Sequence, residues 1–268
     1  MRPSSIYAIF LRQIYLTKSN PARLTGIFVW VVLDIVQWGF ITKYLGGFGG
    51  AAFTLASVIL GAVILWEFFV RIQHGIMTAF LEDIWSRNFI NFFASPLKIG
   101  EYISGLVLTS IVTGVAGFAA MFLLAGALFD YNILRLGVMI LPFIFILFIF
   151  GTAMGTFVSA LIFRLGPAAE WLGWPIPFAL SVFAGVFYPL SVLPVGMQMI
   201  SKLIPASYVF ESMRAIINSG AFSGQMAINL FLGFALASIY LLLAYIFFVK
   251  IYRYNLREGR ISRFSSAE

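Results

Sequence analysis

Long apolar stretches separated by short polar segments dominate this chain. A bilayer core about 30 Å thick needs roughly 20 apolar residues per helical span, and each stretch is long enough to cross it. Between the charged segments we place six spans, at residues 22–44, 51–70, 102–129, 136–163, 171–188 and 226–249. The pattern predicts an all-α integral membrane protein whose residues 1–268 form a single membrane domain.

The residues before the first span, 1–21, predict a helix that lies on the membrane surface. An apolar stripe that includes Ile6, Phe10 and Ile14 recurs at helical spacing, whereas Arg12 lies off that stripe. A helix of this kind lies in the interface plane with its apolar face toward the acyl chains. The alternative is a plain helical lead into the first span.

Composition agrees with a lipid environment. Apolar residues make up 62% of the chain, charged residues 10%, and the mean hydropathy is +1.00. Soluble domains contain about 45–50% apolar and 25% charged residues, so a water-soluble fold of this size could not bury so much apolar surface. Cysteine is absent and His74 is the single histidine, so we predict no disulfide, no thiolate site and no metal site.

The basic residues predict the orientation of the spans. The net charge is +7, but lysine and arginine lie in short segments beside the spans, which indicates membrane topology and not a nucleic-acid partner. With both termini in the cytoplasm, thirteen of the 17 basic residues fall on the inner side. We therefore predict a multi-pass protein of the cell membrane whose basic tail, residues 250–268, meets anionic lipid headgroups.

The connection between the second and third spans, residues 80–98, combines charges with large aromatic side chains. It reads FLEDIWSRNFINFFASPLK and includes Glu82, Asp83, Trp85 and Arg87. This mixture predicts an amphipathic helix on the cytoplasmic surface. Such a helix is either an interfacial anchor or a docking helix that presents these four side chains to a cytoplasmic protein.

Prolines interrupt the last third of the chain, at Pro175, Pro177, Pro189, Pro194 and Pro205. Proline removes an amide donor and breaks a helix, and in lipid the unpaired backbone is tolerated only where protein or water covers it. We therefore predict a span that ends at Tyr188, followed by a re-entrant outer segment over residues 189–219. Glu211 and Arg214 can pair there, which we interpret as a stabilising ion pair more readily than as a direct role in transport.

Four polar residues fall within the predicted spans. Asp34 and Gln37 lie in the first span, and Glu67 and Arg71 are spaced i, i+4 at the inner end of the second. Ionisable groups inside a membrane usually face other helices or a cavity. We interpret Glu67 and Arg71 as an interfacial pair, whereas Asp34 either bonds to a neighbouring helix or lines a pathway.

Common catalytic and nucleotide-binding motifs are missing from the sequence. It contains no G-x-x-x-x-G-K-[ST] loop, no H-E-x-x-H pair and no G-x-S-x-G elbow. We therefore predict that the chain is not an enzyme, and any energy from a nucleotide must come from another chain.

Three stretches resemble the type-2 permease family of ATP-binding cassette exporters. They are WSR at residues 85–87 with ASPLK at 94–98, then GVFYPLSVLP at 185–194, and LIPASY at 203–208 leading to Glu211 and Arg214. Together with the N-terminal helix and the six spans, the resemblance covers essentially the whole chain, and residues 185–194 are its most specific part.

The resemblance implies a homodimer of permease subunits, each docked on a separate cytoplasmic ATPase that binds ATP and Mg²⁺, while this chain binds no cofactor. Residues 80–98 are similar to the coupling helix of the family, with Glu82, Asp83, Trp85 and Arg87 as docking residues. The proline-rich run is similar to its re-entrant outer helices. The family exports amphipathic substrates such as drugs, lipids or lipid-linked glycans by alternating access.

Two other functions are kept as alternatives. An ion-driven secondary transporter would use Asp34 and Glu67 as titrating groups and would transport without ATP. A membrane-embedded enzyme acting on lipid would need Asp34, Glu101 and His74, and would lose activity when they are replaced.

Overall fold

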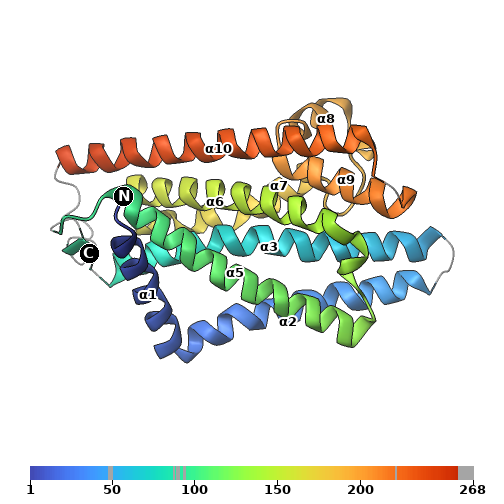
Figure 1. Cartoon of the computed structure of the whole chain (residues 1–268), viewed down its shortest axis with the longest axis horizontal. Coiled ribbons are helices and arrows are strands. Elements are labelled where there is room, and N and C mark those ends of the chain that lie inside the picture. Colours follow the sequence, from blue (N-terminus) through green and yellow to red (C-terminus); the bar gives the residue numbers. More distant parts are fainter. Residues whose placement is uncertain (48–50, 87, 89–90, 93–94, 221, 259–268) are drawn as a thin grey trace.

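The computed structural model describes residues 1–47, 51–86, 88, 91–92, 95–220 and 222–258, and the regular elements in these ranges are helices. The long helices run side by side along the long axis of the molecule (Figure 1). They are α2 (Pro21–Gly46), α3 (Ala51–Trp85), α5 (Ile99–Phe129), α6 (Ile140–Leu165) and α10 (Gly224–Arg257). Each of these five contains a segment long and apolar enough to cross a membrane, which confirms the all-α membrane fold.

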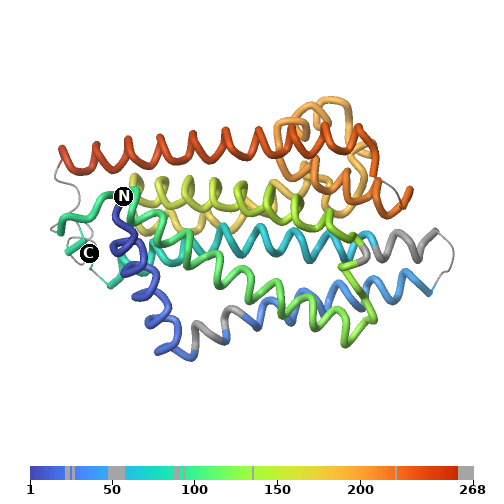
Figure 2. The backbone as a smooth tube through the Cα atoms, in the orientation of Figure 1, coloured from blue at the N-terminus to red at the C-terminus, as the bar shows by residue number. Residues whose placement is uncertain are grey.

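Shorter helices lie at the two ends of the bundle or, in the case of η2 (Pro167–Gly173) and α7 (Pro175–Ala184), run between them. The others are α1 (Pro3–Ser19), η1 (Ile133–Met139), η3 (Leu190–Val192), α8 (Val195–Ser201) and α9 (Pro205–Ser219). Helix α1 crosses one end, where α3 ends at Trp85 and α10 ends at Arg257 (Figure 1). We call this the basic end, and we call the opposite end, where α8 and α9 lie, the cap end. Figure 2 shows the backbone passing repeatedly between these two ends.

Helix α3 forms the centre of the bundle, with α2, α5 and α6 packed along it. Small residues on the neighbouring helices permit this close approach. A Cβ atom at Gly155 of α6 would lie 2.8 Å from the carbonyl oxygen of Gln73, and one at Gly151 would lie 3.0 Å from that of Phe69. The two glycines therefore serve packing within the subunit.

Four predicted spans agree closely with observed helices: 22–44 with α2, 102–129 with α5, 136–163 with α6 and 226–249 with α10. Helix α10 continues eight residues past its predicted end, because Ile251 and Asn255 stay buried and the Asn255 amide donates to the Phe163 carbonyl at 2.8 Å. The first part of the predicted basic tail is therefore helical. Residues 259–268 lie outside the described residues.

The second predicted span, 51–70, is too short. Helix α3 continues to Trp85 because residues such as Ile76 and Phe80 remain in the core. Arg71 therefore lies about 21 Å before the end of the helix. For the same reason the prediction of a separate helix over 80–98 is wrong in its first part, since residues 80–85 are the last turns of α3.

The fifth predicted span, 171–188, is not one α-helix. The chain forms seven residues of 3₁₀ helix in η2 and then ten residues of α-helix in α7. A 3₁₀ helix rises about 2.0 Å per residue and an α-helix about 1.5 Å, so together these pieces extend about 29 Å, near the thickness of a bilayer core. The count of six spans stays a prediction.

Candidate functional site

A buried carboxylate, that of Asp83, joins three helices at the basic end. Its side chain is fully buried, and the Tyr102 hydroxyl on α5 donates to Oδ2 at 2.7 Å. From α1, the Arg12 guanidinium donates to Oδ1 and forms a salt bridge, and the Gln13 amide lies 3.4 Å from the same oxygen. Because charged hydrogen bonds are short and geometrically demanding, this network fixes α1 and α5 against the end of α3.

Phe92, in the connection that follows α3, contacts two side chains of the same network. The Arg12 guanidinium carbon lies 4.9 Å from the centroid of the Phe92 ring, a cation–π contact. The Phe92 ring also lies 5.7 Å from the Tyr102 ring, centroid to centroid. A residue in the middle of the predicted docking segment therefore packs on the side chains that hold Asp83.

Glu101, next to Tyr102 in the chain, connects the starts of α1 and α5. Its carboxylate accepts the Lys98 amide at 3.1 Å, which caps the start of α5, and it accepts the Arg2 amide at 2.6 Å. One carboxylate thus satisfies exposed donors from the beginnings of two helices. The starts of α1 and α5 are held together beside the Asp83 network.

The four predicted docking residues differ in their environments. Trp85 is 58% exposed at the end of α3, and Glu82 is half-buried. Asp83 lies in the interior, so its carboxylate does not belong to the surface that the sequence suggested for docking. Arg87 lies outside the described residues.

The structure brings three of the predicted intramembrane polar residues together. Asp34 of α2 lies close enough to Glu67 and Arg71 of α3 for their charges to interact, whereas the side chain of Gln37 is exposed. The Arg71 side chain passes against α5 at Gly117, where a Cβ atom would lie 2.7 Å from Arg71 Cδ. The cluster therefore joins helices inside the bundle, and the interfacial position of Glu67 and Arg71 stays a prediction.

A second polar contact in the bundle is explained by a proline. Pro177 has no amide hydrogen, so the carbonyl of Gly173 lacks the donor that would normally lie four residues later. Gln73 Nε2 donates to this carbonyl at 2.9 Å, and His74 Nε2 lies 3.3 Å from it. These side chains satisfy a polar group that could not be left unpaired in lipid.

At the cap end, Arg214 binds the end of α7. Its guanidinium donates to the carbonyls of Gly185 and Val186, the latter at 3.0 Å, and to Glu211 Oε1 at 3.1 Å. Glu211 in turn accepts the Leu190 amide at 3.1 Å. Gly185 has a φ of 69°, the left-handed conformation in which glycine commonly ends a helix. The pair thus holds the chain reversal after α7, in agreement with a stabilising role.

The remaining predicted cap residues mark where helices begin or turn. Pro189 and Pro194 directly precede η3 and α8, and Pro205 is the first residue of α9, positions where a missing amide hydrogen costs little. The Tyr188 hydroxyl donates to the Val182 carbonyl at 2.7 Å. That residues 189–219 re-enter the membrane stays a prediction.

The cap is also connected to the bundle through an aromatic contact. The Phe187 ring stacks on Trp38 of α2, with centroids 4.7 Å apart and ring planes 13° from parallel. Helix α9 packs against α6, α7 and α10. The cap therefore packs directly on α2, α6 and α10, which are long helices of the bundle.

Comparison with known proteins gives one finding for this arrangement of helices. The family described as ABC-2 type transporter matches residues 5–218. This range contains the Asp83 network, the Asp34 cluster and the Arg214 cap. No curated protein matches the chain.

Proposed function

Since the chain belongs to the ABC-2 type transporter family and is a membrane-spanning permease subunit, we propose that it exports an amphipathic substrate from the cytoplasm. A separate ATP-binding cassette ATPase, which carries ATP and Mg²⁺, drives the transport. Family membership favours this function over an ion-driven transporter or a lipid-modifying enzyme. The substrate class covers drugs, lipids and lipid-linked glycans.

The observation that carries the proposal is the position of Trp85 beside Asp83. An exposed indole lies directly after a buried carboxylate that binds side chains from both α1 and α5. A protein that binds Trp85 would therefore pull on three helices at once. This is the mechanical connection that an ATPase on another chain needs in order to shift a permease between two states.

The distribution of charge supports a cytoplasmic basic end. Lys98, Arg164 and Arg253 lie at or beside the ends of α5, α6 and α10 there. Lysine and arginine are enriched on the cytoplasmic side of membrane proteins. With this orientation Trp85 faces the compartment that contains ATP, and the cap lies outside.

An exposed apolar face on α2 supports pairing with a second copy. Trp30, Leu33, Phe40 and Tyr44 fall on one side of this helix and are between 52% and 70% exposed. A single subunit leaves this face uncovered, and a homodimer would cover part of it, with the lipid bilayer covering the rest. The pathway would then lie between the two subunits.

Replacing the exposed indole tests the proposal. Trp85→Ala should leave membrane insertion and thermal unfolding unchanged, because the side chain is mostly exposed, but should abolish copurification of the ATPase and substrate-stimulated ATP hydrolysis. The control is Phe222→Ala, an aromatic residue 53% exposed at the cap end, which should keep both. If the ATPase copurified fully with Trp85→Ala and its ATP hydrolysis were still fully stimulated by substrate, Trp85 would not be a docking residue.

A further inference from the structure

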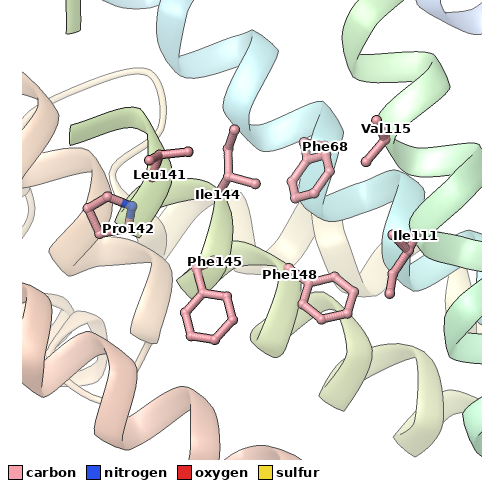
Figure 3. A pocket seen from close by; sticks show the side chains of 8 residues that line it. All are labelled: Phe68, Ile111, Val115, Leu141, Pro142, Ile144, Phe145 and Phe148. Carbon is pink, nitrogen blue, oxygen red and sulfur yellow. The ribbon is translucent and has the colours of Figure 1, made fainter. Parts of the chain in front are cut away.

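An apolar groove of about 590 Å³ lies between α5 and α6 on the side of the bundle. Its volume is within the range of small-molecule sites, about 300–1,000 Å³. Figure 3 shows the lining side chains around the opening, with Phe68 of α3 between the two helices. The lining consists of Phe68, Ile111, Val115, Leu141, Pro142, Ile144, Phe145 and Phe148, all of them apolar.

The groove exists because two neighbouring helices do not pack together. Helices α5 and α6 each pack extensively along α3 but make few contacts with one another. The side chain of Phe68, which is 3% exposed, forms the floor between them. What remains is a concave apolar strip inside the segments that cross the membrane.

The lining is poorly suited to the packing of another helix. Membrane helices approach each other through small residues. On α5 the glycines Gly114 and Gly117 are buried and point at Ile72 and Arg71 of α3, so they are already used inside the subunit. The groove side of α5 carries a β-branched residue instead, Val115, which is 53% exposed.

The groove is continuous with the surface that faces lipid. Phe145 at its edge is 54% exposed and stacks on Phe234 of α10, with centroids 5.8 Å apart. From Leu141 to Phe148 the groove follows α6 for about 10 Å from the cap end, somewhat less than one leaflet of a bilayer core about 30 Å thick. Its length and its apolar lining therefore match hydrocarbon from one leaflet.

We propose that the groove between α5 and α6 binds an acyl chain of a phospholipid from the leaflet at the cap end. All the lining side chains are apolar, so an acyl chain bound here would break no hydrogen bond. The chain would also fill a volume that the side chains leave open and gain dispersion contacts with them. The site lies on the lateral face of the subunit and does not depend on the function proposed for Trp85.

Filling the groove tests the proposal. Val115→Trp places an indole in the groove, and Val112→Trp is the matched control, because Val112 is 42% exposed on the same helix but does not line the groove. Native mass spectrometry of the purified protein should show bound phospholipid in the wild type and in Val112→Trp. Val115→Trp should lose roughly one phospholipid per subunit, because the indole projects into the groove and obstructs the position of the acyl chain. Equal retention in all three proteins would overturn the proposal.

A second measurement in bilayers separates lipid from a second copy of the chain. The sequence contains no cysteine, so Val115→Cys and Val112→Cys each provide a unique site for a bimane label. In vesicles of phospholipids with brominated acyl chains, quenching at position 115 should equal or exceed quenching at 112. Weak quenching at 115, together with cross-linking between two Val115→Cys subunits, would show that a protein covers the groove and would contradict the proposal.

Discussion

The two ends of the bundle satisfy buried polar groups in opposite ways. At the basic end one carboxylate, Asp83, accepts hydrogen bonds from α1 and α5, and its partner Arg12 is 71 residues away in the chain. At the cap end one guanidinium, Arg214, donates to carbonyls 28 and 29 residues away and to Glu211 on its own helix. The basic end is therefore a joint between separate helices, whereas the cap is assembled from one continuous segment. Under the proposed function, an ATPase bound at Trp85 would act on three helices through this joint, whereas the Arg214 contacts lie within one segment.

The largest effect is expected from removing the carboxylate of the joint. Asp83→Ala leaves Arg12 and Tyr102 without their acceptor, and loss of one partner of a buried ion pair costs on the order of 3 kcal/mol. The midpoint of thermal unfolding in detergent should fall, and ATPase stimulation should be lost. Replacing both partners, as Arg12→Met with Asp83→Leu, should recover part of the stability. An Asp83→Ala midpoint equal to that of the neighbouring Glu82→Ala variant would show that the joint contributes nothing.

A smaller and more local effect is expected at the cap. Arg214→Met removes the donor from the carbonyls of Gly185 and Val186, and each buried unsatisfied group costs about 1–3 kcal/mol. The thermal midpoint should fall while the ATPase still copurifies, because the basic end is untouched. Arg214→Lys should recover only part of the lost stability, because the three donors of lysine lie on one nitrogen and cannot reach both carbonyls and the carboxylate as the planar guanidinium does. Lys202→Met, at an exposed cap residue, is the control and should behave as the wild type.

The smallest effect is expected where the broken helix crosses the bundle between the two ends. A Cβ atom at Gly173 would overlap the sulfur of Met77 on α3, and overpacking costs about 1–3 kcal/mol, at the low end where a flexible methionine can move. Gly173→Ala should therefore lower the midpoint of thermal unfolding slightly. When Met77→Ala is added, the overlap is absent, so the double variant should lose less stability than the sum of the two single variants. Strict additivity of the two changes would contradict the close contact.

The sequence predicted the features that depend on neighbours in the chain. Hydropathy located α2, α5, α6 and α10, because each is a long apolar run, and the i, i+3 spacing of Glu211 and Arg214 predicted their pairing. The extent of α3 was missed because Arg71 interrupts the apolar run, and only the fold shows that Asp34 on another helix lies beside it.

Features that depend on distant partners were not predictable. The FLEDIWSR pattern looks amphipathic, and nothing in it indicates that Asp83 turns inward to Arg12 and Tyr102. A proline four residues after Gly173 signals an unpaired carbonyl, but not that Gln73 would bind it. The groove arises from the scarcity of contacts between α5 and α6, which no single segment encodes.

The proposed docking of an ATPase at Trp85 requires this residue to lie on the cytoplasmic side of the membrane. Because the chain contains no cysteine, Trp85→Cys and Phe222→Cys can each be labelled with a membrane-impermeant maleimide at a unique site. In intact cells we expect labelling of Phe222→Cys alone. In inverted vesicles we expect labelling of Trp85→Cys, with protection when the ATPase is bound. Labelling of Trp85→Cys from outside intact cells would contradict a cytoplasmic position of the basic end.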